Sequence, residues 1–353
     1  MAYSYKFHGD HVGGLLRPPA LLDAQRQAAA GTIGSAELRH AQNEAIAAAV
    51  KTQKEAGLDL FTDGEFRRRD FWSCVVDAFD GFTPGQTPAV TGRLRQLRRM
   101  TEGDAAFLRT VTRGHLKVTL VAPGFVAERC WRDGVTDLAY RSREELGAQL
   151  AAWTRAEIEA LFAEGVMYVQ LDNPGYTGFL NSGAHAAGNG RERAGAFERM
   201  LAADTAAVAG VKRPDGASVG IHLCGGDDPG RWLTGGGDAA VAERLLGSLP
   251  VDRFLVEYDD WRAGSFAPLR YVPQGKVVVL GMVGPQTQQD DVDELVARID
   301  EAAALIDIDD LAVSPRCGFA APSMGGPRLT EREQFKKLRI VADAAIIGWG
   351  PEG

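Results

Sequence analysis

The sequence predicts an α/β protein built as a single (β/α)8 TIM barrel, and three observations support this prediction. Short apolar runs recur along the 353 residues, and each is followed by a turn-forming or acidic residue and then by a helical pattern. Eight such runs occur, which is the number of strands in a (β/α)8 barrel. No stretch has the composition of a linker, so residues 1–353 are expected to form one domain.

The expected strands are short, apolar and unevenly spaced, as strands buried on both faces of a parallel sheet can be. Their expected ranges are 7–12, 58–62, 116–121, 167–171, 218–222, 254–256, 277–280 and 311–313. The gap between the second and third runs, about residues 70 to 115, is too long for a single helix. An insertion between strands 2 and 3 is therefore expected.

The sequence indicates where two of the expected helices begin. Ser142 and Glu145 form a capping box before an apolar-periodic stretch, and Gly165 marks its end. Thr330 and Glu333 repeat the box before the last helix. In such a box the side chains satisfy backbone N–H groups that the first helical turn leaves without partners. We therefore expect helices to begin at both places.

Composition and charge limit the classes of partner. The formal net charge of −8 argues against nucleic acid as the principal partner. No apolar run approaches the roughly 20 residues that a membrane span needs, and the N-terminal residues lack a secretory pattern, so a cytoplasmic protein is expected. The four cysteines are widely spaced, which in a reducing compartment predicts core thiols, ligands or nucleophiles rather than a disulfide framework. The sequence carries no signal for an oligomeric state.

Potential metal ligands follow several of the expected strands, at the end of a barrel where catalytic groups gather. His222 and Cys224 are two residues apart, so in an extended strand their side chains point to the same face. Glu257 ends the sixth run and Cys317 follows the eighth. Together they offer one imidazole, two thiolates and one carboxylate, a donor set suited to tetrahedral zinc. Taken singly, Glu257 could be a salt-bridged loop carboxylate and Cys317 a buried turn thiol.

The sequences around these residues resemble those of the cobalamin-independent methionine synthase family. The likeness lies in Gly-Ile-His222-Leu-Cys224-Gly, in Phe-Leu-Val-Glu257-Tyr-Asp-Asp and in Ala-Val-Ser-Pro-Arg-Cys317-Gly-Phe, and it extends to residues 11–18, 62–70 and 169–174. It covers essentially the whole chain, which at this length looks like the catalytic barrel without the second, duplicated barrel of full-length synthases. The resemblance implies zinc held by these four side chains, with a small-molecule thiol joining or displacing the carboxylate.

The resemblance also implies how substrates are bound. Glu65 and Asp172 would bind the amino group of a thiol such as homocysteine, and a folate would supply the methyl group. The other reading of Glu65 is an ion-pair partner for the arginines beside it. Where the family has a serine that helps to hold the amino-acid carboxylate, this chain has Gly13-Gly14, so the hydroxyl is missing and Arg17 is the candidate substitute.

Two further departures concern acidic groups. The family's Asp-Glu pair reads Asp172-Asn173 here, and no histidine follows His222, although the family is expected to use a late histidine to protonate the folate nitrogen. Losing such an acid costs about 10²- to 10⁴-fold unless another group replaces it. Tyr176, beside the Asp172 turn, is the first candidate for the proton donor. The other candidates are His11, His185 and Asp259.

The sequence therefore predicts zinc-dependent transfer of a methyl or other alkyl group to a thiol. Three alternatives remain. The first is an alkyl transferase resembling the epoxyalkane:coenzyme M transferases, in which a zinc thiolate opens an epoxide. The second is a noncatalytic zinc- or thiol-binding barrel. The third is a metal-free barrel of the related uroporphyrinogen decarboxylase type, in which the cysteines would be incidental.

Overall fold

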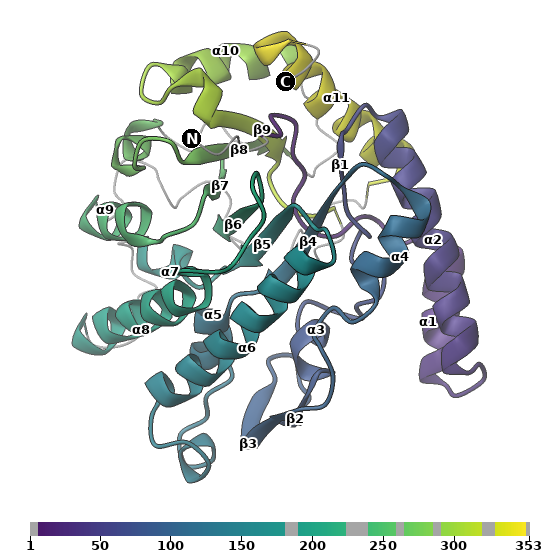
Figure 1. Ribbon diagram of the computed structural model, residues 1–353, viewed down its shortest axis with the longest axis vertical. Coiled ribbons are helices and arrows are strands. Elements are labelled where there is room, and N and C mark those ends of the chain that lie inside the picture. The colour runs from purple at the N-terminus through teal and green to yellow at the C-terminus, as the bar shows by residue number, and fades with distance from the viewer. Residues whose placement is uncertain are drawn as a thin grey trace.

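The computed structural model describes residues 6–180, 190–223, 239–258, 265–284, 291–319 and 329–350. Cys224, His185 and Asp259 lie outside these ranges. Seven strands form one sheet in the order β1-β4-β5-β6-β7-β8-β9, and every neighbouring pair is parallel. The sheet curls around a common centre with helices outside it (Figure 1). This arrangement confirms the predicted α/β barrel.

The strands of the main sheet lie close to the predicted apolar runs. Their bounds are β1 Leu60–Phe61, β4 His115–Val121, β5 Tyr168–Asp172, β6 Ser218–Leu223, β7 Arg253–Glu257, β8 Val277–Val283 and β9 Leu311–Pro315. The helices are α1 Pro19–Ala29, α2 Ser35–Glu55, α3 Ser73–Val76, α4 Asp104–Val111, α5 Pro123–Arg129, α6 Arg143–Ala163, α7 Thr177–Leu180, α8 Gly190–Val208, α9 Ala239–Ser248, α10 Val292–Ala303 and α11 Glu331–Trp349. No helix among the described residues is long and apolar enough to cross a membrane.

The first expected strand, residues 7–12, is not a regular strand in the structure. It forms one isolated parallel bridge, between Gly9 and Val313 of β9. Toward β1 the contact is made instead by the His11 side chain, whose Nε2 lies 3.1 Å from the Leu60 carbonyl oxygen. Phe7 and Gly13 have positive φ angles of 39° and 72°, so left-handed residues flank the segment and shorten its extended part. The prediction was right about its place in the barrel and wrong about its conformation.

The predicted insertion between strands 2 and 3 is confirmed. It contains α3, an antiparallel hairpin of β2 (Phe79–Thr83) and β3 (Ala89–Gln96), and α4. The hairpin lies at the edge of the molecule, away from the main sheet (Figure 1). It is attached to the segment after β4, because Val90 N donates to Cys130 O at 2.8 Å and Leu94 N donates to the Tyr140 hydroxyl at 2.9 Å.

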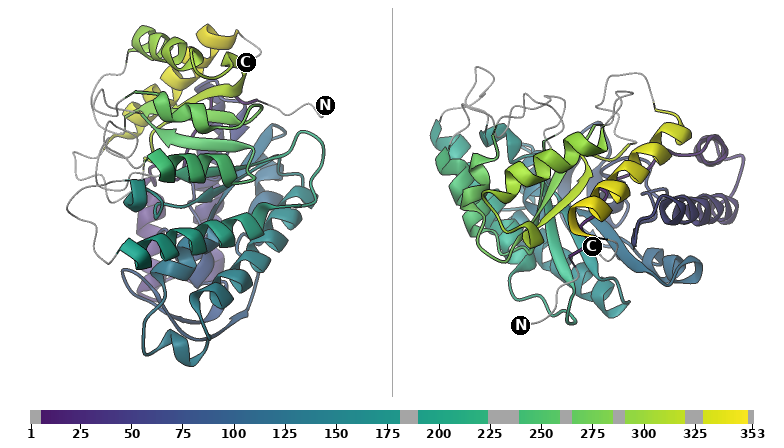
Figure 2. Two further views of the ribbon diagram at one scale, coloured as in Figure 1. Left: turned by 90° about the vertical axis from the view of Figure 1, so that its left-hand side faces the viewer. Right: turned by 90° about the horizontal axis from the view of Figure 1, so that it is seen from above.

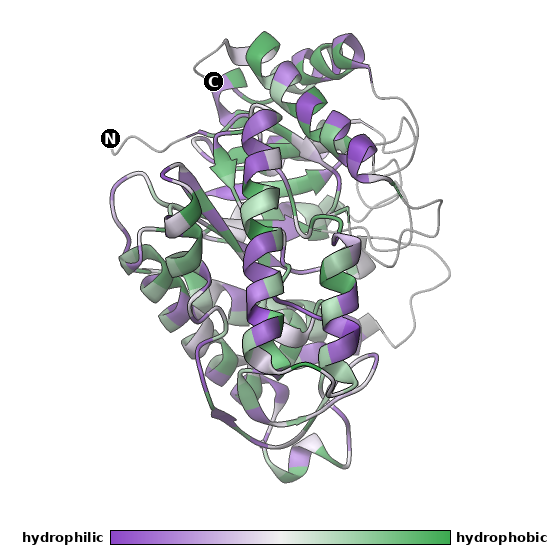
Figure 3. Ribbon diagram, turned by 90° about the vertical axis from the view of Figure 1, so that its right-hand side faces the viewer, coloured by the Kyte–Doolittle hydropathy of each residue, from purple (hydrophilic) through white to green (hydrophobic). Residues whose placement is uncertain are grey.

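Helices cover the outside of the sheet, and helices begin at both predicted capping boxes. The complete box forms at Thr330 and Glu333, whereas at Ser142 only the serine half forms and the Glu145 carboxylate accepts from Arg141 N and Arg93 Nη1. Ser142 Oγ accepts from Glu145 N at 3.3 Å at the start of α6, and Thr330 Oγ1 accepts from Glu333 N at 3.2 Å at the start of α11. Helices α5, α6 and α8 pack against one another on one side of the barrel (Figure 2). Along α2 hydrophilic and hydrophobic residues are mixed (Figure 3), and the buried residues recur every three to four positions, so one face of the helix packs inward.

Side chains inside the barrel form a layer of their own, separate from the larger core between sheet and helices. The apolar members of this inner layer are Val12, Leu60, Tyr168, Leu255, Val277, Val279 and Ala312. Lys117 lies in register with Tyr168, and its Nζ is 2.6 Å from Asp10 Oδ1, with both side chains fully buried. This ion pair joins β4 to the irregular first segment, across the part of the barrel where backbone pairing is weakest.

Candidate metal centre

Three potential metal ligands meet where the strands end. His222 lies near the end of β6, Glu257 is the last residue of β7, and Cys317 follows β9 by two residues. One ligand atom from each lies within 4.8 Å of the other two, and all three residues are buried. Cys317 Sγ is 3.2 Å from Glu257 Oε1, and His222 Nε2 is 3.9 Å from the same oxygen.

The spacing of these atoms suits zinc. Zinc–ligand bonds of about 2.0–2.3 Å place tetrahedral ligand atoms roughly 3.3–3.8 Å apart. The two measured separations, 3.2 and 3.9 Å, bracket that range. An imidazole, a carboxylate and a thiol are also common zinc ligands in combination. The donor set and its geometry therefore fit the metal that the sequence predicted, while Cys224, the fourth predicted ligand, lies outside the described residues.

A glycine allows the chain after β9 to reach β7. Gly281 of β8 is paired with Glu257 on one side and Ser314 on the other. A Cβ on Gly281 would lie 3.0 Å from Arg316 Cα and 3.1 Å from the Val256 carbonyl oxygen, tighter than nine in ten real Cβ contacts, so the backbone on either side would have to shift. Cys317 can approach Glu257 because β8 has no side chain at this position.

The two oxygens of Glu257 have different neighbours. Oε1 faces Cys317, whereas Oε2 lies 3.2 Å from the Nε of Arg316, whose side chain is 9% exposed. The guanidinium holds the carboxylate in one orientation and offsets part of its charge. Sequence reasoning gave Arg316 no role, although its position directly before the predicted ligand Cys317 could have pointed to it.

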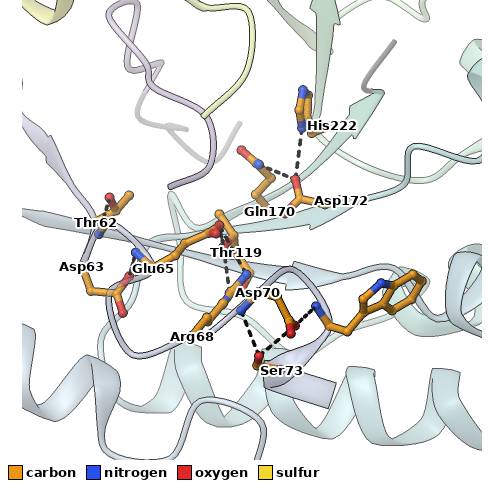
Figure 4. Close-up of polar contacts among 12 residues, drawn as sticks. Thr62, Asp63, Glu65, Arg68, Asp70, Ser73, Thr119, Gln170, Asp172 and His222 are labelled. Carbon is orange, nitrogen blue, oxygen red and sulfur yellow. Dashed lines mark hydrogen bonds and ion pairs between the residues drawn. The ribbon is translucent and has the colours of Figure 1, made fainter. Parts of the chain in front are cut away.

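His222 is held from its other side. Its Nδ1 lies 3.2 Å from Asp172 Oδ1, and the same oxygen accepts a 2.7 Å hydrogen bond from Gln170 Nε2 (Figure 4). Asp172 was predicted as a substrate-binding residue, and the structure brings it to the candidate metal ligands. Gln170 was not predicted, although it precedes Asp172 by two residues on β5 and therefore shares its face.

Glu65 lies on the loop after β1, close to an arginine, as one of its two sequence readings proposed. Its Oε1 accepts from Thr119 Oγ1 at 2.7 Å and lies 3.3 Å from Arg68 Nη1 (Figure 4). Arg68 Nη2 in turn donates to Thr119 Oγ1 at 2.8 Å. Burial disfavours the charged form of Arg68, but neighbouring carboxylates, Glu65 foremost, raise its pKa above the usual value.

The residues predicted to hold a substrate carboxylate have structural partners. Arg17 Nη2 donates to the carbonyl oxygens of Arg68 at 3.0 Å and Glu65 at 3.3 Å, so it fixes the backbone of the Glu65 loop. Gly13 has a φ of +72°, and a Cβ there would lie 3.1 Å from Gly318. The first loop thus passes directly over the turn that follows Cys317, where a side chain at Gly13 would be strained and would press on the Gly318 backbone.

Tyr176 and Asn173 point to a buried carboxyl group on α8. Tyr176 Oη donates to Asp204 Oδ2 at 2.9 Å, and Asn173 Nδ2 donates to the same oxygen at 2.7 Å. Asp204 Oδ1 accepts from Gly124 N at 2.8 Å, so this cluster ties the turn after β5 to α5 and α8. Burial raises the pKa of Asp204 to about 6 and that of Tyr176 well above its usual value. The structure therefore gives the Tyr176 hydroxyl an acceptor, Asp204, outside the His222–Glu257–Cys317 cluster.

His11, another candidate proton donor, is buried beside the Lys117–Asp10 pair. Burial, reinforced by the Lys117 charge, lowers the pKa of His11 to about 4. The imidazole is therefore neutral near pH 7, and its Nε2 donates to the Leu60 carbonyl oxygen. This contact assigns His11 a role in closing the barrel.

The fold and the site define a (β/α)8-barrel protein with a candidate metal centre at the carboxyl ends of its strands. The chain belongs to the family described as "Cobalamin-independent synthase, Catalytic domain", whose profile matches residues 17–345. This assignment confirms both the predicted family and the prediction that the protein is an enzyme.

Relatives agree with the family assignment. The uncharacterized proteins YxjH and YxjG of Bacillus subtilis are each 33% identical, over 97% of this chain and 95% of their own length. The 5-methyltetrahydropteroyltriglutamate–homocysteine methyltransferase of Nitratidesulfovibrio vulgaris is 26% identical over 87% of this chain and 38% of its own length. Among solved structures, a putative vitamin-B12 independent methionine synthase from Listeria monocytogenes is 30% identical, with a TM-score of 0.79 and 99% of each chain covered.

Proposed function

We propose that this protein transfers a methyl group to the sulfur of a small-molecule thiol, with zinc held by His222, Cys224, Glu257 and Cys317. The observation that carries the proposal is the convergence of the three described ligands within 4.8 Å, in a chain that belongs to the cobalamin-independent synthase family. Zinc at this place would supply one chemical effect, which is to lower the pKa of a coordinated thiol so that the substrate sulfur is a thiolate near neutral pH.

The protein's own residues would prepare the site for that thiol. Glu257 is the ligand that the incoming sulfur would join or displace, and Arg316 would keep the released carboxylate close through Oε2. Glu65, supported by Thr119 and Arg68, would bind the amino group of an amino-acid thiol such as homocysteine. Arg17 would act by holding the Glu65 loop, as its two backbone contacts suggest.

A methylated folate is the donor that the Nitratidesulfovibrio relative's name suggests. A leaving amine of that kind needs a proton, and no histidine follows His222 to supply it. Tyr176 stays our predicted donor, although its present hydrogen bond to Asp204 favours a role in holding the Asp172 turn. Unchanged turnover in Tyr176→Phe would remove it from the mechanism.

The test combines metal content with single-turnover chemistry. Metal-replete protein should hold about one zinc per chain. Cys317→Ala should lose most of that zinc, whereas Cys130→Ala, which removes a buried thiol at the C-terminal end of α5, should keep it. Zinc contents that do not differ between the two variants would refute the proposed ligand set.

Transfer itself is measured by mixing the enzyme with homocysteine or coenzyme M and a panel of donors that includes methylated folates and epoxyalkanes. Methylated homocysteine is the expected product. An opened epoxide would favour the epoxyalkane-type alternative instead. Formation of no alkylated thiol from any donor would favour a noncatalytic zinc- or thiol-binding barrel. The chemistry requires reduced thiols, which agrees with the predicted cytoplasmic location.

A further inference from the structure

Asp172 and Gln170 extend from the Nδ1 side of His222, opposite the candidate metal ligands, in a short chain of hydrogen bonds. Gln170 Nε2 lies 2.7 Å from Asp172 Oδ1, and that oxygen lies 3.2 Å from His222 Nδ1. On the far side of the ring, Nε2 faces Glu257 Oε1 at 3.9 Å. The imidazole thus presents Nδ1 to the Asp172 carboxylate (Figure 4) and Nε2 to the ligand cluster.

Strand register sets this chain of contacts. Asp172 of β5 is paired directly with His222 of β6, and Gln170 lies two residues earlier on the same face of β5. Gln170 is fully buried, and Asp172 is 6% exposed. With β5 and β6 paired in this register, both side chains are buried between the strands and have few other positions.

Chemistry fixes the direction of each hydrogen bond. A carboxylate only accepts hydrogen bonds, so both nitrogens that face Asp172 Oδ1 must carry protons. Turning the Gln170 amide over would bring its oxygen against the carboxylate, which is repulsive. A proton on Nδ1 leaves Nε2 with its lone pair, the form in which a neutral imidazole binds a metal.

We propose that Gln170 and Asp172 are positioning residues that hold His222 in the tautomer with its proton on Nδ1, so that Nε2 is the metal-binding atom. This inference rests on the proposed function, in which His222 is a zinc ligand. It differs from the role that the family resemblance implies for Asp172, because binding of a substrate amino group would not require contact with the imidazole. Gln170 acts on His222 only through Asp172.

Zinc affinity measured without any thiol distinguishes the two roles. The experiment titrates zinc against a chelator of known affinity in the wild type, Asp172→Asn, Asp172→Ala and Gln170→Met. Removing such an outer partner weakens metal binding by roughly 10- to 100-fold, and we expect Asp172→Ala toward the upper end and Gln170→Met toward the lower end. Gln53→Met is the matched control, because Gln53 is equally buried but bonds to Thr62.

A second measurement reports the tautomer of the His222 imidazole directly. In metal-free protein labelled with ¹⁵N-histidine, the His222 signals should report a proton on Nδ1 in the wild type and a mixture of tautomers in Gln170→Met. This comparison holds even if Asp172→Ala fails to fold, and the missing signals of His222→Gln identify the residue.

The outcomes separate this inference from the proposed function. Zinc affinity that is unchanged in Asp172→Asn and Gln170→Met, together with weaker thiol binding, would overturn the inference and return Asp172 to the substrate. A wild-type protein that binds no zinc would overturn the proposed function and this inference with it. Weaker zinc binding in the Asp172 and Gln170 variants, with Gln53→Met unaffected, supports the inference.

Discussion

The hydroxyl of Thr119 donates to the carboxylate of Glu65 across 2.7 Å, which links the middle of β4 to the loop after β1. Glu65 needs such a partner because its backbone is strained. Its φ is +60°, a left-handed value that non-glycine residues rarely adopt. Strained residues of this kind persist only when their surroundings hold them, and here Thr119, Arg68 and Arg17 do so.

Thr119→Val should destabilise the loop that carries Glu65. Valine keeps the shape of threonine but leaves the Glu65 carboxylate without its hydroxyl donor, so the free energy of unfolding should fall by about 1–3 kcal/mol. Because Glu65 would also move, kcat/KM for the thiol should fall. Urea unfolding and steady-state kinetics measure the two effects. Thr154→Val, at a buried position of α6, serves as the control and should leave kcat/KM unchanged. Equal kcat/KM in the wild type and Thr119→Val would show that Glu65 does not depend on this hydrogen bond.

Gly318→Ala should disturb the turn that carries Cys317. A Cβ at Gly318 would lie 2.4 Å from Gly14 N and 2.9 Å from Gly14 O, and backbone atoms cannot give way as a flexible side chain can. Overpacking of this kind costs about 1–3 kcal/mol, and the shifted turn should also weaken zinc binding. Gly348→Ala adds the same methyl group to α11, where it would meet nothing within 4 Å. It should change neither zinc affinity nor, by more than about 1 kcal/mol, stability.

His11→Gln should reduce the sensitivity of the fold to acid. Unfolded chains protonate histidine near 6.5, whereas burial lowers the pKa of His11 to about 4 in the folded protein. Between these values the unfolded state binds more protons, so stability is complete above pH 6.5 and is lost as the pH falls toward 4. The gap corresponds to roughly 3 kcal/mol.

The measurement is urea unfolding at pH 7 and pH 4. The wild type should lose about 3 kcal/mol more than His11→Gln over this interval. His40→Gln alters an exposed position of α2 and should follow the wild type. Parallel losses in the wild type and His11→Gln would show that His11 does not govern the acid response.

Lys117→Met should destabilise the protein where β4 packs on the irregular first segment. Removing the lysine leaves Asp10 as a fully buried charge without its 2.6 Å partner, which costs about 3–5 kcal/mol. The matched control is Lys6→Met, because Lys6 pairs with Asp310 at 2.7 Å but is 38% exposed. That variant should lose at most about 1 kcal/mol. Similar losses in the two variants, read from thermal or urea unfolding, would contradict a special role for the buried pair.

Local patterns predicted the parts of the fold that local chemistry decides. Apolar runs located seven of the strands because a buried parallel strand is apolar on both faces. The boxes at Ser142 and Thr330 located helix starts because capping involves atoms only three residues apart. The segment at 7–12 was predicted less well, since its ladder is replaced by one bridge and a histidine side chain.

For the candidate site, the sequence by itself determined which residue types follow which strands. That was enough to predict His222, Glu257 and Cys317 together, because the carboxyl ends of parallel strands lie at one end of a barrel. Cys224 stays a prediction, as does the organisation of residues 1–353 as one domain.

Only the tertiary structure decided which side chains bond to the functional residues. Thr119 and Arg316 are polar residues of ordinary appearance in the sequence, and they gain roles because the packing of the strands and the glycine at position 281 bring them within hydrogen-bond distance of Glu65 and Glu257. The same is true of Tyr176, whose neighbour Asp204 is 28 residues away in sequence. Such contacts depend on how strands and helices pack, and packing is set by the whole chain at once.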